Sequence, residues 1–487
     1  MFTRGAPHLL ALFVPGFCLG AAASDGILVQ ARLLTPISTY SSKSGTEVAA
    51  LLTTAVCSEG GRAIPEGAQF RGIIQRIGKV GLGLVHESAS LQLNFRILSL
   101  PDGRADPIEA RLVGIDNARE RVDNRGKVHG IRATATLSNR AGERLAFAVL
   151  GHPAVRLPLF LLEASVFHFP DPEIEYGRGT GISLDVHFPD ALGPVAPCPL
   201  SNAETSPDAL AEMQDLVDEL PYWSYSTKQR QPMDLVNLVF TGGPEALDRA
   251  FTSAGWTGSR PNSMGAGVKA IRAIAEVRAY VDAPMRNLVL EGAEPDFRFQ
   301  KSLNTFEKRD HLRIWRRNEN LGGQPVWAAA ATRDLAATFA MHPFGFTHQI
   351  QNNVDLERDE VVHELVFTGC VDSVTYVWRP KTIRGAGDPY RRGVSTDSRV
   401  AVVRLNGCTP PPDEPIGATN LRQPGKVVRV ARRVILTARN HFLRDNIVWR
   451  TGDALRLAYL TLRDWNGQRK DELRALEQDS MRAWPSK

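Results

Sequence analysis

The amino-acid sequence predicts a multidomain α+β protein, and three observations lead to that class. Residues 25–187 hold short alternating runs separated by Gly, Pro and Asp, which is typical of a β-barrel or β-sandwich. Residues 232–408 alternate between helix-like and strand-like runs, which indicates an α/β domain with a mixed sheet and helices. Residues 409–487 are rich in Arg and Lys and predict a basic, partly helical tail.

Residues 1–24 have the pattern of a secretory signal peptide. Arg4 supplies the positive charge, Leu9–Leu19 is the apolar run, and Ala21–Ser24 provides small residues for cleavage before Asp25. The apolar run is shorter than the roughly 20 residues that a membrane-spanning helix needs. We therefore expect the mature protein in the periplasm or outside the cell.

The first folded region is predicted as a β-barrel domain over residues 25–187. Glu47–Leu52 and Ser90–Ile97 have the alternation of half-buried strands. Pro101, Asp102 and Gly103 form a turn, because Pro presets φ and Gly supplies a positive φ.

Four segments of this region resemble the periplasmic β-barrel of the TrbI/VirB10 family of conjugation and type IV secretion proteins: Ala31–Ile37, Ile64–Gly72, Phe95–Gly103 and Gly179–Val186. Their order and spacing fit the family. The resemblance implies a barrel fold and a setting in the cell envelope. We do not expect the family's cytoplasmic part, membrane anchor or long Pro-rich linker, so the resemblance does not imply a place in a secretion channel.

A proline-rich linker is predicted over residues 188–231, with a helix within Asp208–Glu219. In the α/β domain that follows, Leu235–Phe240 is the first expected strand. Pro244 opens a helix that Gly255 ends, since Pro suits the first helical position and Gly the residue after the last.

Three further elements are expected in this domain. The spacing of apolar residues predicts a helix over Val268–Val281 and another over Leu356–Phe367, the latter closed by Gly369. Arg399–Leu405 reads as a strand that completes the domain. In the tail, Ala454–Asp464 and Lys470–Trp484 are the predicted helices.

Seven short motifs between residues 237 and 359 resemble the LssY C-terminal-like domain: Asn237–Gly243, Ala254–Trp256, Asp296–Gln300, His311–Trp315, Thr332–Asp334, Thr347–Ile350 and Val354–Asp359. Members of that family join this module to integral-membrane segments, including those of the phosphatidic-acid-phosphatase type. The resemblance implies work at the envelope or on lipids. The resemblance does not assign a catalytic role to any residue.

The candidate catalytic residues are His311, Asp334 and His348. Imidazole and carboxylate together suit acid–base chemistry near neutral pH. The same three side chains, with Asp355, are the candidate ligands for a divalent metal with one position open to water. Their spacing matches no established metal motif, and Asp355 has a structural explanation as the cap of the helix that follows.

The candidate ligand-binding residues are Arg313 and Trp315. On a strand, His311, Arg313 and Trp315 point to one face. Arg holds phosphate or carboxylate in a two-pronged hydrogen-bonded fork, and Trp supplies a flat wall, so this face suits an anionic group. A solvent-facing strand with a packed Trp is the structural alternative.

After removal of the signal peptide four cysteines remain, and they allow three pairings into two disulfides. Cys370 and Cys408 are the preferred pair because they bracket one compact segment.

The formal net charge of +5 is concentrated near the C-terminus, where residues 384–487 hold 20 Lys/Arg and 11 Asp/Glu. Such a tail could bind anionic lipid, a cell-wall polymer or nucleic acid. The alternative is that its charges only face solvent. Nucleic acid is not favoured because aromatic residues are not interleaved with the cations. With 43% hydrophobic residues the chain has enough apolar residues for folded cores.

Three functions remain open on the sequence. The first is a non-enzymatic envelope protein that binds an anionic ligand or an envelope partner. The second is a hydrolase of phosphate or lipid-linked substrates that uses His311, Asp334 and His348, with or without a metal. The third is a component of a secretion channel.

Overall fold

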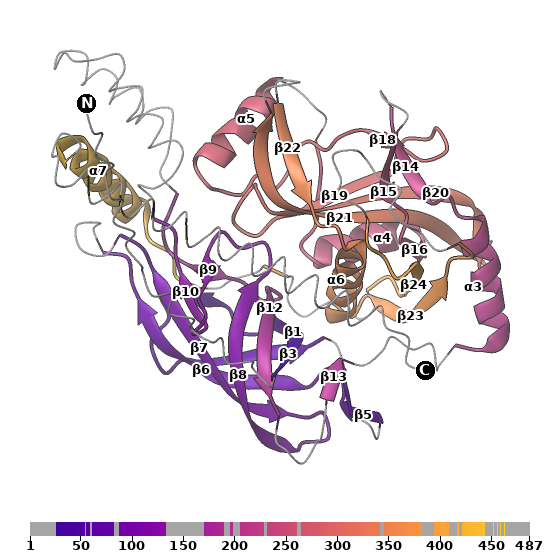
Figure 1. Ribbon diagram of the computed structural model, residues 1–487, viewed down its shortest axis with the longest axis horizontal. Coiled ribbons are helices and arrows are strands. Elements are labelled where there is room, and N and C mark those ends of the chain that lie inside the picture. Colours follow the sequence, from indigo (N-terminus) through magenta and orange to yellow (C-terminus); the bar gives the residue numbers. More distant parts are fainter. Residues whose placement is uncertain are drawn as a thin grey trace, which may run out of the picture.

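The computed structural model describes residues 26–53, 55–58, 61–81, 87–132, 170–188, 195–197, 205–227, 231–260, 264–340, 345–381, 394–408, 416–417 and 421–443, together with 451, 455, 458 and 462. The expected signal peptide and most of the expected tail lie outside these residues. Two domains lie side by side, an N-terminal β-barrel and a larger domain with helices on both faces of a sheet (Figure 1).

Six antiparallel strands close the barrel. They are β1 (Ile27–Leu33), β3 (Glu47–Leu52), β6 (Gln69–Gly78), β7 (Ser90–Ser99), β8 (Ala105–Ile115) and β12 (Gly181–His187). They follow the order β6-β3-β1-β12-β8-β7, and β7 pairs back with β6, so these six strands form a closed ring. Alternate residues such as Leu33, Phe70 and Phe95 fill the interior. The predicted β-barrel is confirmed.

Short strands extend the barrel. β9 (Arg121–Val122) and β10 (Lys127–His129) continue the sheet beyond β7. β2 (Ile37–Ser38) pairs with β11 (Glu175–Tyr176), and β4 (Val56–Ser58) pairs with β5 (Gly61–Ile64) and β13 (Val195–Pro197).

The second domain is built on a mixed sheet. In order its strands are β17 (Thr257–Gly258), β19 (Phe297–Lys301), β20 (Arg309–Leu321), β21 (Gln324–Ala340), β16 (Leu238–Thr241), β24 (Arg399–Leu405) and β23 (Val371–Trp378), and β22 (Gly345–Ile350) pairs with the end of β21. β16 and β24 run parallel and the other pairs are antiparallel. This confirms the predicted mixed sheet, with β24 in the expected place.

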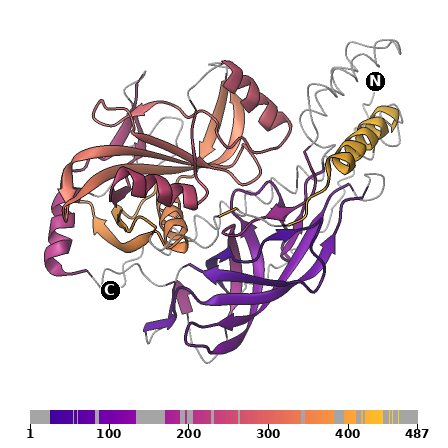
Figure 2. The same ribbon diagram turned by 180° about the vertical axis from the view of Figure 1, so that it is seen from behind.

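Helices cover both faces of this sheet (Figure 2). On one face α4 (Pro244–Ser253) and α6 (Val354–Phe367) bury Phe251, Val361 and Leu365 against the strands. On the other face α3 (Pro207–Glu219) packs through Leu216 and Val217, beside the small sheet of β15 (Pro232–Leu235), β14 (Trp223–Ser226) and β18 (Leu288–Val289). The stretch expected to be a linker therefore holds elements that pack on the second domain.

Two predicted elements differ from the structure. The strand expected over Leu235–Phe240 is divided, because the side chain of Asn237 donates to the Val354 carbonyl and accepts from the Ala331 amide. The helix expected over Val268–Val281 is α5 (Met264–Ala275), and it ends before Val277, whose φ is +48°.

One helix was not predicted. α7 (Lys426–Leu443) lies outside the second domain, at one end of the barrel. Residues 455, 458 and 462 of the expected helix Ala454–Asp464 are helical, and Lys470–Trp484 lies outside the described residues. Within the described part of the chain, every helix is too short or too polar to span a bilayer.

Candidate functional site between the two domains

An arginine of the barrel joins the two domains. Arg32 lies on β1 and is 2% exposed, yet its guanidinium points into the second domain. It forms ion pairs with two glutamates of α6, at 2.6 Å to Glu360 and 3.3 Å to Glu364. Lys301 and the indole of Trp256 also bond to Glu364, at 2.5 Å and 2.6 Å. Arg32 of the barrel thus neutralises negative charge on α6 of the second domain.

A second arginine, Arg333 on β21, continues this network. Its guanidinium lies 2.8 Å from Asp310 and 2.9 Å from Glu357, both of them buried. It is 3.9 Å from Asp116, which comes from the barrel immediately after β8. The neighbouring Asn117 donates to Asp310. The domain interface is therefore a buried set of ion pairs to which both domains contribute.

The carboxyl groups of this network differ in their protonation. Burial raises the pKa of Asp116 to about 7, and the Glu360 carboxylate adds to the rise while Arg333 and Arg32 oppose it. Burial also disfavours ionised Glu360, but Arg32 and Arg333 outweigh it and lower its pKa to about 2. Burial raises the pKa of Asp310 as well. Asp116 therefore titrates near neutral pH.

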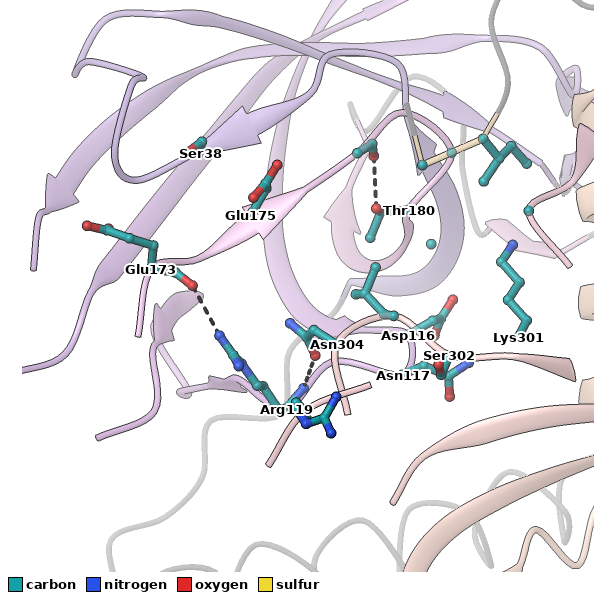
Figure 3. A pocket seen from close by; sticks show the side chains of 18 of the residues that line it. Ser38, Asp116, Asn117, Arg119, Glu173, Glu175, Thr180, Lys301, Ser302 and Asn304 are labelled. Atoms are coloured by element: carbon teal, nitrogen blue, oxygen red, sulfur yellow. Dashed lines mark hydrogen bonds between the residues drawn. The ribbon is translucent and has the colours of Figure 1, made fainter. Parts of the chain in front are cut away.

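A cavity of about 560 Å³ opens beside this network. Arg119 and Asp116 from the barrel, with Lys301 and Asn304 from the second domain, are among the side chains around it (Figure 3). Eight acidic and five basic residues line it: Asp116, Asp171, Glu173, Glu175, Glu276, Asp310, Glu360, Glu364, Arg32, Arg119, Arg278, Lys301 and Arg429. The lining therefore carries more acids than bases.

The cations around this cavity are largely held by the protein itself. Arg119 donates to Glu120 and to the carbonyls of Asp171 and Glu173. Arg32 and Lys301 are paired with α6 as described above. Asp116, in contrast, has its nearest ion-pair partner, Arg333, at 3.9 Å.

The comparisons with known proteins bear on the second domain. The family model described as "LssY C-terminus" matches residues 217–400. These residues form an LssY C-terminal domain. The match begins in the last turn of α3 and ends at the second residue of β24, so it includes α4, α6 and the strands of the mixed sheet other than most of β24.

Among solved structures, the chain is similar to ComB10 of the Com type IV secretion system of Helicobacter pylori. The identity is 14% and the TM-score 0.19, over 33% of this chain and 84% of the ComB10 chain. A search of curated proteins found no significant match.

Two of the three predicted catalytic residues are in contact in the LssY C-terminal domain. His311 Nε2 lies 2.7 Å from Asp334 Oδ2, and Arg309 approaches the same carboxylate at 3.4 Å. Burial lowers the pKa of His311, and Arg309 and Arg313 add to this while Asp334 opposes it. The imidazole is 8% exposed and neither residue lines the interdomain cavity. The side chain of the third predicted residue, His348, lies outside the described residues.

The predicted anion-binding face is occupied by the protein. Arg313 is 5% exposed and binds Asp234 at 2.6 Å and the Arg286 carbonyl at 3.1 Å. Trp315 is 2% exposed and packs in the apolar layer under α3. The two residues share a strand face with His311, and other elements of the domain cover that face.

The fourth candidate metal ligand is engaged elsewhere. Asp355 accepts hydrogen bonds from Thr396 and the Asp397 amide and pairs with Arg358. The cap of α6 is Asn353, whose side chain accepts from the Asp355 amide, so the predicted cap was misplaced by two residues. Among the residues described, no three His, Cys, Asp or Glu side chains are grouped so as to hold a metal ion.

The predicted disulfide Cys370–Cys408 is present. It joins the start of β23 to the segment after β24, within the core of the domain. Cys57 of the barrel is disulfide-bonded as well.

The interdomain residues were missed from the sequence, although α6 carries a signal. Glu357, Glu360 and Glu364 recur at helical spacing on one side of the helix and are 1%, 8% and 2% exposed. The sequence reading attributed acids at the start of this helix to its dipole, which acts only within the first turn. Acids that recur along one buried face of a helix indicate buried cationic partners, and here these are Arg32 for Glu360 and Glu364 and Arg333 for Glu357.

Proposed function

We propose that the chain is a non-enzymatic binding protein of the cell envelope and that its ligand occupies the interdomain cavity. The observation that carries this proposal is the cavity itself. Its volume of about 560 Å³ is within the usual range for small-molecule sites, and such sites occur preferentially between domains. Both domains supply charged side chains to it.

The ligand that best fits this cavity is small, polar and positively charged. The lining holds more acids than bases, and Arg32, Arg119 and Lys301 are engaged by protein groups. The nearest ion-pair partner of Asp116 is Arg333, at 3.9 Å, and a ligand ammonium would provide a closer one. An anionic ligand would meet the acids instead, so we do not propose one for this cavity.

The envelope setting rests on two features of the chain. Residues 1–24 have the pattern of a secretory signal, and Cys370 and Cys408 form a disulfide. Disulfides persist in oxidising compartments such as the periplasm and are rare in the cytosol. We therefore propose that the protein works in the periplasm or outside the cell.

Binding is favoured over hydrolysis by the place of the His311–Asp334 pair. Both side chains are buried, at 8% and 2% exposure, beneath the elements that cover the sheet. A general base must come within hydrogen-bond reach of the substrate's proton. Neither residue lines the cavity in which a substrate would lie.

A thermal-unfolding screen tests the proposal. The purified chain is heated with ethanolamine, cadaverine or choline, and separately with phosphate or citrate. A ligand that binds the folded protein at about 100 times its Kd stabilises it by about 2.7 kcal/mol, so we expect a cationic compound to raise the unfolding temperature.

The matched variants are Asp116→Asn in the cavity and Asp248→Asn at an exposed site on α4. The stabilisation by the cation should be lost in the first and kept in the second. If the anions alone stabilise the protein, or if Asp116→Asn retains the full effect of the cation, the proposed ligand class is wrong.

A further inference from the structure

α7 has an unusual distribution of charge for a helix at the edge of a domain. Its 18 residues include four arginines and one lysine and no acid. It lies at the end of the barrel, on the side away from α3 (Figures 1 and 2). The helix therefore presents positive charge at the periphery of the molecule.

One side of α7 is fixed to the barrel. Arg432 donates to the Val80 carbonyl at 2.9 Å and pairs with Glu173 at 2.9 Å. Arg432 and Leu436, four residues apart, are 7% and 2% exposed. Because residues four apart share a helix face, these contacts set the rotation of the helix about its axis.

The opposite side of α7 is apolar and open. Val427, Val430 and Val434 are 81%, 52% and 57% exposed, and their spacing of three and four residues puts them in one stripe. With 3.6 residues per turn, this stripe points away from the face that holds Arg432 and Leu436. Single exposed valines are ordinary, but three in one stripe form a surface that disfavours contact with water.

Cations border this stripe along one edge. At 100° for each residue, Lys426, Arg429 and Arg433 fall between the valine stripe and the face that contacts the barrel. Lys426 and Arg429 are exposed and Arg433 is half-buried, and Arg429 also lines the interdomain cavity. An apolar stripe with a basic edge is the pattern of helices that lie in the plane of a membrane surface. Leu455 and Leu462, in the next described helical residues, are also exposed, at 68% and 59%.

We propose that α7 docks the protein onto an anionic lipid surface, with the valines among the upper parts of the acyl chains and the cations among the phosphates. Charge decides between this occupant and a second copy of the chain. Two copies of α7 would bring together like charges with no acid on either helix, whereas anionic lipid attracts each cation.

The inference rests on the proposed envelope setting, but it does not require a ligand in the cavity. The full-length chain is mixed with vesicles of phosphatidylcholine alone, or of two parts phosphatidylcholine and one part phosphatidylglycerol, and bound protein is measured by co-sedimentation. We expect binding to the second kind only, and weaker binding as salt is added.

Two sets of variants test the two components of the surface. Lys426→Gln, at an exposed position of α7, should weaken vesicle binding by about fivefold at low salt. The triple variant Val427→Ser, Val430→Ser, Val434→Ser should weaken it by at least tenfold, because the stripe supplies the apolar contact.

The control variant is Ile73→Ser with Ile97→Ser, at exposed positions of the barrel that are 41% and 45% exposed. It should bind vesicles like the wild type. Circular dichroism and the unfolding temperature of each variant show whether it is folded, so a loss of binding in a folded protein supports the proposal.

Three results would overturn the inference: no binding of the wild type to phosphatidylglycerol vesicles, equal binding to both kinds of vesicle, or full binding by the triple valine variant. A dimer in light scattering that becomes a monomer in that variant would assign the stripe to self-association instead. Asp116→Asn should leave vesicle binding unchanged, so a failure here is separable from a failure of the cavity proposal.

Discussion

Replacing Asp116 by Asn should stabilise the protein at alkaline pH and leave it unchanged at acidic pH. The side chain lies in the interdomain cavity, where burial and Glu360 raise its pKa from 3.8 to about 7. An acid whose pKa is raised by folding stabilises the folded state most when it is protonated, below the unfolded pKa of 3.8. That stability is lost as the pH rises through about 7.

The magnitude follows from the two pKa values. The difference between 3.8 and about 7, at about 1.4 kcal/mol for each pKa unit, gives about 4 kcal/mol as an upper limit. The side chain is 21% exposed, so water and relaxation reduce the cost. We expect Asp116→Asn to be more stable than the wild type by about 2–4 kcal/mol at pH 8, because Asn is neutral at every pH.

Urea unfolding of both proteins between about pH 4.5 and pH 8.5 measures this difference in the free energy of unfolding. It should be small at the acid end and grow through neutrality. Asp248→Asn, at an exposed site on α4, should show no such rise. A variant that is less stable than the wild type at pH 8 would refute the reasoning, since Asp116 would then be an ionised partner of Arg333.

Three further predictions concern the buried ion pairs and the disulfide. Arg32→Met leaves two buried glutamates of α6 without their barrel partner, so it should cost about 3–5 kcal/mol and divide the calorimetric unfolding peak into two. Arg313→Met should lower the free energy of unfolding by a similar amount, and the double variant Arg313→Met with Asp234→Leu should recover most of that loss in urea unfolding. If Arg313 instead serves to bind an anion, Arg313→Met would reduce ligand affinity and change the stability little. Cys370→Ala with Cys408→Ala should lower the free energy of unfolding by about 2–4 kcal/mol, and an unchanged midpoint in urea would contradict a bonded pair.

Much of the fold could be predicted because its signals are local. Pro244 and Gly255 bound α4, and Gly369 with φ of +73° ends α6 where the sequence places it. The strand predicted at Arg399–Leu405 is β24 in full. Such features depend on a few neighbouring residues, which a single sequence shows directly.

Helix α5 shows where local patterns mislead. Val268 and Ile271 have the spacing of a buried stripe, but they are 65% and 52% exposed, and the residues that pack are Ala273 and Ile274. Ile274 has the same spacing and is buried, so tertiary contacts cover only part of the apolar stripe.

The candidate site could be predicted only in part, because its groups are far apart in the chain. His311 and Asp334 were expected to act together, and neighbouring strands do bring them within 2.7 Å. Arg32 and Glu360 are separated by 328 positions, and no local pattern relates them. Successive residues of a strand point to opposite faces, so Asp310 lines the interdomain cavity while the predicted His311, one position later, does not.

The acid in the cavity connects stability with function. Holding Asp116 in a buried position beside Glu360 destabilises the folded protein at neutral pH, as the pKa of about 7 requires. Proteins commonly accept such costs at binding sites, where a group is placed for its ligand and not for the fold. A cationic ligand would relieve this cost by pairing with the ionised carboxylate.

The central claim, that a cationic ligand binds against Asp116 in the interdomain cavity, is tested most directly by the pH dependence of affinity. The cation that stabilises the protein most in the thermal screen is titrated by calorimetry at pH 6 and pH 8. With a pKa of about 7, ionised Asp116 increases about tenfold between these values, so we predict about tenfold tighter binding at pH 8 and no pH dependence in Asp116→Asn. Affinity that is the same at both pH values, or the same in Asp116→Asn as in the wild type, would contradict the account.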